Sequence, residues 1–232
     1  MKIIIVSDTA DYLLVDKPAG FSVHRDQQLV SLLDLLRQQT GYPYLAPVHR
    51  LDQATSGLWL LAKTPASAAA LSAQFEQRQV EKYYLALSDK KPSKKQGKVE
   101  GALVKARAGS YRLARSGEPW SVTQFFSYGL GDGCRLFLLK PLTGRTHQLR
   151  VVMRSLGAPI LGDTRYGSSQ SQADRCYLHA YSLAFSVGSE LIRYTLPPAQ
   201  GTAFLAEPCQ QRLAELSAPW QLSWPQIEKG KL

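Results

Sequence analysis

Short apolar runs, separated by glycine, proline and polar turn residues, recur along this chain of 232 residues and limit what it can fold into. Such runs are typical of β-strands. We expect strands at residues 12–15, 58–62, 83–87, 99–104, 121–128, 135–139, 177–185 and 191–195. The first of them should end at Lys17-Pro18-Ala19-Gly20, because proline and glycine favour a turn.

Helical spacing occurs in fewer places. Leucines between residues 29 and 36 predict a helix over 29–39 that stops at Gly41. Thr64-Pro65 supplies an N-cap and a first-turn proline for an alanine-rich helix to about residue 79. Two more helices are expected at 147–156 and 207–216. Because strands outnumber helices and come in hairpin-like pairs, we expect an α+β fold with a mixed or antiparallel sheet, as one domain over residues 1–232.

The positive charge is concentrated in one segment. The chain has 28 Lys+Arg against 18 Asp+Glu, a formal charge of +10. Residues 90–115 hold nine cations and one acid, Glu100, and so carry +8 of that total. Such a patch suits a polyanionic partner, since each neutralised phosphate releases counterions. The alternative is a solvated lysine-rich loop, and composition does not choose between them. A membrane-surface role is disfavoured, because residues 90–98 contain Pro92 and Gly97 and no bulky apolar side chain.

Several chemistries lack their sequence signals. We find no phosphate-binding P-loop and no Gly-x-Ser-x-Gly of an α/β-hydrolase. Gly129-Leu130-Gly131-Asp132-Gly133 lies between two expected strands and predicts a hairpin turn, not a dinucleotide site. The four histidines fall in separate segments, so no metal site is expected. With three scattered cysteines and no apolar run of about eighteen residues, we expect a soluble, cytoplasmic protein without disulfides.

Two segments are dense in polar residues beside apolar strands: residues 47–58, and residues 143–150 followed by 157–163. Asp52 stands in a turn just before the apolar stretch 58–61. A partly desolvated carboxylate there favours a nearby cation, which Arg50 or Arg150 could supply. An ionised and oriented carboxylate can act as a nucleophile. The alternative, commoner for any aspartate taken alone, is a structural residue that caps the turn or bridges to arginine.

Five motifs follow one another over about residues 11–187. In chain order they are Asp16-Lys17-Pro18-Ala19-Gly20, His49-Arg50-Leu51-Asp52 with Thr55-Ser56-Gly57-Leu58, Lys82-Tyr83-Tyr84-Leu85-Ala86, Thr143-Gly144-Arg145-Thr146-His147-Gln148-Leu149-Arg150, and Leu178-His179-Ala180. In residues and order they resemble the RluA-like family of pseudouridine synthases, which convert uridine in RNA to its C-glycoside isomer. One such match would be suggestive, whereas five in order are very specific.

The resemblance implies three catalytic residues. Asp52 would be the nucleophile, and Arg150 its basic partner. Tyr84 would pack on the uracil ring and could help a proton transfer. Without the motif, Tyr84 would be an ordinary strand aromatic, with Tyr83 pointing to the opposite face.

The resemblance also implies substrate-binding residues. Leu178, which alone would be assigned to the core, would form an apolar wall beneath the base. Arg50 would face the RNA near the flipped nucleotide. We assign Arg145, His147 and Thr55 to substrate binding as well, although Arg145 and His147 could merely orient their loop.

The chemistry fits these residues. The reaction breaks the bond between uracil N1 and C1′ and rejoins the base through C5, which needs no electron or group carrier, so we expect no cofactor and no metal. A stacked uridine must first flip out, at a cost of a few kcal/mol. Phosphate contacts, for which we name Lys94, Lys95 and Lys98, would offset that cost. The expected substrate is a specific uridine in structured ribosomal or transfer RNA.

The family fold is a single α+β domain with a long, bent, mostly antiparallel mixed sheet flanked by helices and loops, which agrees with the strand pattern. Family members often carry histidine where this chain has Val152 and Ala158, and neither position is catalytic. Because the first motif begins so early, we expect a stand-alone catalytic domain without an N-terminal S4-type RNA-binding module. We also expect a monomer with no obligate protein partner.

Two rival functions remain at this point. The first is a non-catalytic RNA-binding or ribosome-associated protein on the same scaffold, against which the joint presence of Asp52, Tyr84 and Arg150 argues. The second is a cofactor-free hydrolase that uses Cys176 or Cys134 with His179. The hydrolase would require a thiol with a depressed pKa.

Overall fold

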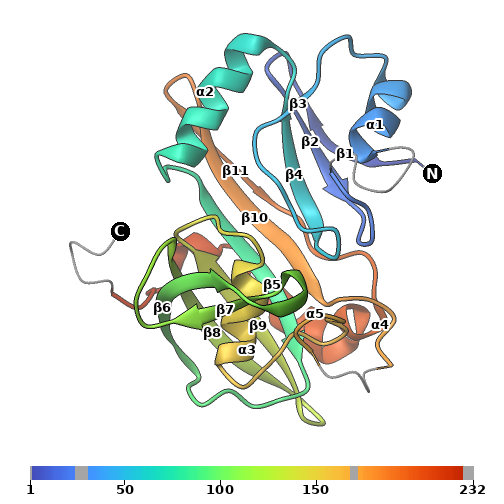
Figure 1. The fold of residues 1–232 in the computed structure, drawn as a ribbon. Coiled ribbons are helices and arrows are strands. Elements are labelled where there is room, and N and C mark those ends of the chain that lie inside the picture. The colour runs from blue at the N-terminus through green and yellow to red at the C-terminus, as the bar shows by residue number, and fades with distance from the viewer. Residues whose placement is uncertain (1, 24–30, 168–171, 227–232) are drawn as a thin grey trace. The chain divides into compact units, whose positions relative to one another are not determined.

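A computed structural model describes residues 2–23, 31–167 and 172–226 (Figure 1). The chain divides into two compact units, Met1–Glu81 with His179–Leu196, and Lys82–Leu178 with Pro197–Leu232. The described residues form eleven strands, paired mostly antiparallel, together with helices, which confirms the α+β class. The single domain and the long, bent sheet concern both units together and stay predictions.

The first unit is built on a mixed sheet. Its strands are β1 (Ile4–Asp8), β2 (Tyr12–Lys17), β3 (Ala46–Pro47), β4 (Ser56–Ala62), β10 (Leu178–Val187) and β11 (Glu190–Thr195). They lie in the order β1, β2, β4, β10, β11, and β3 also pairs with β4. Pairing is antiparallel except between β4 and β10, where His179 lies opposite Ser56 and Ala180 opposite Gly57.

Two capped helices belong to this unit. Helix α1 (Leu32–Thr40) begins with a capping box between Ser31 and Asp34, and Gly41 ends it in the left-handed conformation, as expected. Residues 29 and 30 of the expected helix lie outside the described residues. Helix α2 (Pro65–Glu76) starts at the expected N-cap, Thr64, and ends three residues early. It packs against β4, where Leu71 joins the apolar core.

The second unit is built on an antiparallel sheet. Its strands are β5 (Glu81–Ser88), β6 (Gln96–Lys105), β7 (Tyr111–Ala114), β8 (Trp120–Gly131) and β9 (Cys134–Pro141), in the order β5, β9, β8, β6, β7. The expected hairpin turn between β8 and β9 is confirmed. Asp132 and Gly133 have φ of 47° and 77°, and two successive positive φ angles are typical of a type I′ hairpin turn.

The helices of this unit are α3 (Gln148–Ser155), α4 (Thr202–Leu205) and α5 (Glu207–Glu215), with 3₁₀ turns η1 (Arg107–Gly109) and η2 (Pro219–Gln221). Helix α3 packs against β7 and β8, and Val151 joins a buried cluster with Leu103 and Tyr166. None of the described helices is both long and apolar enough to cross a membrane.

Residues 90–98, which the sequence suggested could be a solvated lysine-rich loop, are only partly a loop. Strand β6 already begins at Gln96, so Lys98 lies within a strand. The backbone carbonyl of Lys95 also accepts a hydrogen bond from the Ser127 amide, at 2.7 Å. Strands β1, β3 and β7 and helix α4 were not foreseen. Strand β7 is hidden in the sequence because it has four residues and two of them, Tyr111 and Arg112, are polar.

Candidate active site

Asp52 stands in a turn of the first unit that is closed by local hydrogen bonds. Its backbone carbonyl accepts from the Thr55 amide at 3.0 Å. The neighbouring Gln53 is clasped to Gly20: the Gly20 amide donates to the Gln53 carbonyl at 2.8 Å, and Gln53 Nε2 donates to the Gly20 carbonyl at 2.9 Å. The Asp52 side chain is half-buried. This burial is compatible with the partial desolvation expected for the carboxylate, which stays a prediction.

Lys17 supports the Asp52 turn, a role that sequence reasoning missed. Its side chain is fully buried at the end of β2. Its ammonium group donates to the carbonyls of Pro18 at 2.9 Å, Gln53 at 3.2 Å and Thr55 at 2.7 Å. An ammonium group has three hydrogens, and three carbonyls receive them. Lys17 thereby ties the first motif to the turn that presents Asp52; the Lys-Pro pair in that motif was the available signal.

The strand that follows the turn is anchored to β10. Gly57 has a φ of 102°, and a Cβ there would lie 2.3 Å from the Ala180 carbonyl oxygen, so only glycine fits. Beside it, the Ser56 hydroxyl and His179 Nδ1 are 2.8 Å apart, and His179 Nε2 lies 2.8 Å from the Leu196 carbonyl. A carbonyl only accepts, so Nε2 donates, and in the neutral ring Nδ1 then accepts from serine. Buried His179 is a structural link.

His49, in the same motif as Asp52, is also structural. Its ring stacks on Phe75, with centroids 4.7 Å apart. Its Nε2 accepts from the Leu60 amide at 3.0 Å, and its carbonyl accepts from Trp59 Nε1 at 3.2 Å. The next residue, Arg50, is exposed. Its predicted role in facing RNA requires that exposure and stays a prediction.

Tyr84 and Leu178 belong to the second unit. Tyr84 is half-buried in β5, opposite Leu139 of β9. Tyr83 is fully buried and packs on Trp224, with ring centroids 5.7 Å apart. The two tyrosines therefore differ in environment, as strand alternation predicts. Leu178 is buried where β10 begins.

Arg150 forms a buried ion pair that the sequence did not indicate. Its Nε and Nη2 donate to the two carboxylate oxygens of Asp163, at 2.8 and 2.7 Å, and the Asp163 side chain is fully buried. The amides of Arg165 and Tyr166 donate to Asp163 Oδ1 at 2.9 and 3.0 Å. Burial alone would raise the pKa of Asp163, but the Arg150 guanidinium and these amides outweigh it and lower that pKa below its usual value.

The loop before α3 is held by its own residues. Buried Gln148 accepts from the Arg145 amide at 3.0 Å and from the Thr143 hydroxyl at 2.8 Å. His147 has a left-handed φ of 56°, and its Nδ1 lies 2.9 Å from the Tyr166 hydroxyl. The Tyr166 ring in turn packs against the Arg150 guanidinium, whose Cζ lies 5.1 Å from the ring centroid. The orienting role left open for His147 is supported by these contacts.

The lysines named for the RNA backbone differ in environment. Lys94 and Lys95 are exposed. Lys98 is half-buried, and its ammonium lies 3.2 Å from Glu100 Oε2. The Lys98 charge is thus partly neutralised within the strand.

The structure argues against Cys134 as the nucleophile of the hydrolase alternative. Burial raises the pKa of the Cys134 thiol, the opposite of what a nucleophilic thiol needs. Both ring nitrogens of His179 already have partners in Ser56 and Leu196. Within the described part of the chain, no three His, Cys, Asp or Glu side chains gather as a metal site.

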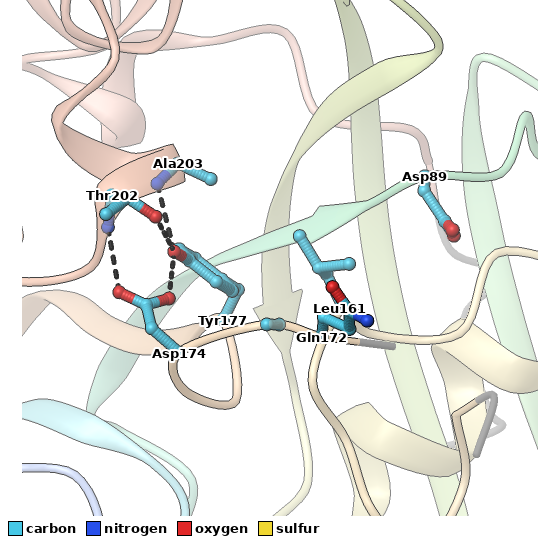
Figure 2. A pocket seen from close by; sticks show the side chains of 8 residues that line it. Asp89, Leu161, Gln172, Asp174, Tyr177, Thr202 and Ala203 are labelled. Atoms are coloured by element: carbon cyan, nitrogen blue, oxygen red, sulfur yellow. Dashed lines mark hydrogen bonds between the residues drawn. The ribbon is translucent and has the colours of Figure 1, made fainter. Parts of the chain in front are cut away.

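A pocket of about 490 Å³ lies in the second unit, and Figure 2 shows side chains that line it. Asp174 accepts from the Tyr177 hydroxyl and from the Thr202 amide, the latter at 3.0 Å, and the Ala203 amide donates to the Tyr177 hydroxyl at 2.9 Å. Asp89 adds a second carboxylate to the lining. The polar groups bind one another and the charge is negative, so this pocket does not suit RNA.

The predicted site residues divide between the units. Arg50, Asp52 and Thr55 lie in the first. The second unit holds Tyr84, Arg145, His147, Arg150, Leu178 and the three lysines. The assembly of one site from both sets, including the pairing of Arg150 with Asp52, stays a prediction.

Comparison with known proteins identifies the class. The sequence profile described as RNA pseudouridylate synthase matches residues 11–155. An uncharacterized RNA pseudouridine synthase of Haemophilus influenzae is 45% identical over 201 residues, which cover 87% of this chain and 90% of that protein. The dual-specificity RNA pseudouridine synthase RluA of Escherichia coli K12 is 34% identical over 196 residues, 79% of this chain and 87% of RluA.

A solved structure agrees. Human RNA pseudouridylate synthase domain containing 1 superimposes with a TM-score of 0.75 at 26% identity, covering 98% of this chain and 97% of the human one. The protein is therefore an RNA pseudouridine synthase, an isomerase. Within that class, the chain belongs to the RluA family.

Proposed function

We propose that this enzyme isomerises a specific uridine in structured ribosomal or transfer RNA, with Asp52 as the nucleophile and the target base flipped out of its stack. The observation that carries the proposal is the construction of the Asp52 turn. A fully buried lysine and the paired Gly20 and Gln53 hold the backbone of the turn that carries the half-buried Asp52. Holding a reacting group in one geometry removes much of the entropic barrier to attack.

The chemistry assigns each residue a task. The bond between N1 and C1′ breaks, a bond between C5 and C1′ forms, N1 gains a proton and C5 loses one. The Asp52 carboxylate supplies the nucleophile, and Tyr84 packs on the ring and helps the proton transfer. Leu178 supports the flipped base and Arg50 contacts the RNA beside it. Arg150 directs the carboxylate from a position that Asp163 holds rigid.

Flipping the base costs a few kcal/mol, which contacts to the RNA backbone offset. The binding site around the nucleotide is formed by Arg145, His147 and Thr55. The exposed Lys94 and Lys95 bind phosphates of the RNA backbone. The enzyme works in the cytoplasm as a monomer.

The substitution Asp52→Asn tests the nucleophile, because a neutral amide of the same shape does not attack carbon effectively. We expect release of tritium from RNA labelled at uridine C5 to be lost, while RNA affinity stays similar or rises. The fold should survive with little loss of stability, since Arg150 keeps its pair with Asp163. Thermal melting and an RNA-binding assay accompany the tritium measurement.

Asp132→Asn is the matched control. Asp132 is exposed in the β8–β9 turn, where asparagine tolerates the positive φ, so this variant should behave as the parent enzyme. Substantial tritium release by folded Asp52→Asn would refute the assignment. Loss of RNA binding by a folded Asp52→Asn protein would instead make Asp52 a recognition residue.

A further inference from the structure

A second pocket in the second unit, of about 530 Å³, lies where the β6–β7 hairpin meets the loop before α3. Lys105, Tyr111, Glu118, Arg145 and Thr146 are among the described residues that line it, and the proposed catalytic residues are not. Figure 1 shows the hairpin beside α3, which packs on β7. A pocket of about 300–1,000 Å³ is the size that binds small ligands, and a nucleotide is of that class.

The strand register places a cation beside an aromatic ring in this pocket. Lys105 at the end of β6 lies directly opposite Tyr111 at the start of β7, so the two side chains share one face of the hairpin. Val104 and Arg112 form the next pair; Val104 also contributes to the lining, whereas Arg112 does not. Lys105 is exposed, and its ammonium makes no hydrogen bond or ion pair within the described residues.

Arg145 brings a second cation that is already held in place. Its amide is fixed by Gln148, and its Nε donates to the Trp120 carbonyl at 3.1 Å. The two terminal guanidinium nitrogens have no hydrogen-bond partner among the described residues. A fixed guanidinium with two free donor nitrogens matches two phosphate oxygens and loses little side-chain entropy on binding.

The charge of the pocket selects an anion. Lys105 and Arg145 contribute +2 and Glu118 contributes −1, a net charge of +1. Glu118 is exposed, and its Oε2 already accepts a hydrogen bond from the Trp120 amide at 2.8 Å, which engages one of the two carboxylate oxygens. Half-buried Tyr111, whose ring packs edge-to-face on His147 with centroids 5.6 Å apart, adds an aromatic surface.

We propose that this pocket is an RNA-binding subsite that holds one phosphodiester of the substrate RNA between Lys105 and Arg145, with the adjoining sugar or base against Tyr111. The inference rests on the proposed function, since the ligand is the RNA that the enzyme modifies. A phosphodiester is monoanionic, which matches the net charge, and its two non-bridging oxygens match the two cations.

The first test compares Lys105→Ala with Arg112→Ala. Both remove one positive charge from the same hairpin, but only Lys105 faces the pocket. We measure the affinity of a fluorescein-labelled RNA stem-loop over a salt series. For Lys105→Ala we expect the slope of log K against log salt to fall by about 0.7–0.9 and the affinity to fall about tenfold at low salt. Arg112→Ala should keep the parental slope. An equal loss in both variants, or none in Lys105→Ala, would overturn the subsite.

The second test should change RNA affinity in the opposite direction. Glu118→Gln removes the negative charge and keeps a carbonyl that can accept from the Trp120 amide. We expect this variant to bind the same stem-loop several-fold more tightly than the parent. Unchanged or weaker binding would contradict a phosphate next to Glu118.

A kinetic experiment separates the two proposals. At saturating RNA, single-turnover tritium release by Lys105→Ala should match that of the parent, while kcat/KM falls, because only binding is lost. If the parent enzyme released no tritium from any cellular RNA, the proposed function would fail, and the binding tests would still judge the pocket. Parental affinity of Lys105→Ala in an active enzyme would overturn the pocket alone.

Discussion

The residue with the largest difference between expectation and structure is Arg150. Its bidentate pair with Asp163 places a buried carboxylate against the cation that the family motif assigns to catalysis. Asp163 also receives two backbone amides, so the guanidinium is held by a group that is itself fixed. Removing one partner of such a pair leaves the other charge buried and uncompensated.

Asp163→Asn should therefore lower the free energy of unfolding by about 3–5 kcal/mol at neutral pH. The pKa of Asp163 is lowered in the folded protein, so its contribution is present above the unfolded value and disappears as pH falls through the folded value. The parent should thus lose stability as pH drops below about 4, and the variant should lose less.

Urea unfolding over a pH series checks this, with Asp132→Asn as the exposed control. Identical pH profiles for the parent and Asp163→Asn would show that the carboxylate is not stabilised by Arg150.

At the scale of elements, the Asp52 turn depends on the end of β2. Lys17 ends that strand, and its ammonium reaches two carbonyls of the turn. The same turn leads into β4, where Gly57 lets the backbone of β10 approach closely. The proposed nucleophile is thus positioned by contacts from β2 and by the pairing of β4 with β10, not by its loop alone.

Lys17→Met keeps the apolar stem but leaves three carbonyls without this donor. We expect it to lower the free energy of unfolding by about 3 kcal/mol or more, at roughly 1–3 kcal/mol for each buried group left unsatisfied. In the protein that remains folded, kcat should fall more than KM rises, because Asp52 loses its position.

Lys63→Met is the matched control. Lys63 pairs with Asp8 in a partly exposed ion pair, 2.7 Å apart, so its loss should cost less than about 1 kcal/mol and leave kcat unchanged. Equal effects of the two substitutions on stability and kcat would show that Lys17 has no special role in the turn.

At the scale of the whole molecule, the net charge of +10 is better described by its distribution than by its sum. The basic segment contains both free and engaged cations. Lys94 and Lys95 are exposed, whereas Lys98 lies beside Glu100. Only cations free to meet phosphate release counterions on binding.

Replacing Lys94 and Lys95 together by alanine should lower the salt slope of RNA binding by up to about 1.8 on a duplex, or about 0.9 for each contact. Lys98→Ala should change it less, because Glu100 already neutralises part of that charge. Filter binding of total RNA at several salt concentrations measures both. A slope that changes only in Lys98→Ala would mean that Lys94 and Lys95 are merely solvated.

Local features, and the order of motifs along the chain, could be predicted from the sequence. The N-cap of α2, the Gly41 stop of α1 and the Gly131-Asp132-Gly133 hairpin turn depend on residues within one turn of each other, so composition and spacing suffice. The five motifs in order likewise predicted the family from sequence alone, and that resemblance assigned Asp52 as the nucleophile.

Other features were decided only by the tertiary structure. Arg150 bonds to Asp163, 13 positions away, and buried Lys17 bonds to the Thr55 carbonyl, 38 positions away. His179 bonds to Ser56 across 123 positions. No local propensity specifies which of several aspartates meets a given arginine, since that choice depends on how strands and helices pack. A buried charge accepts only the partner that packing brings within hydrogen-bond reach, and packing is a property of the folded chain as a whole.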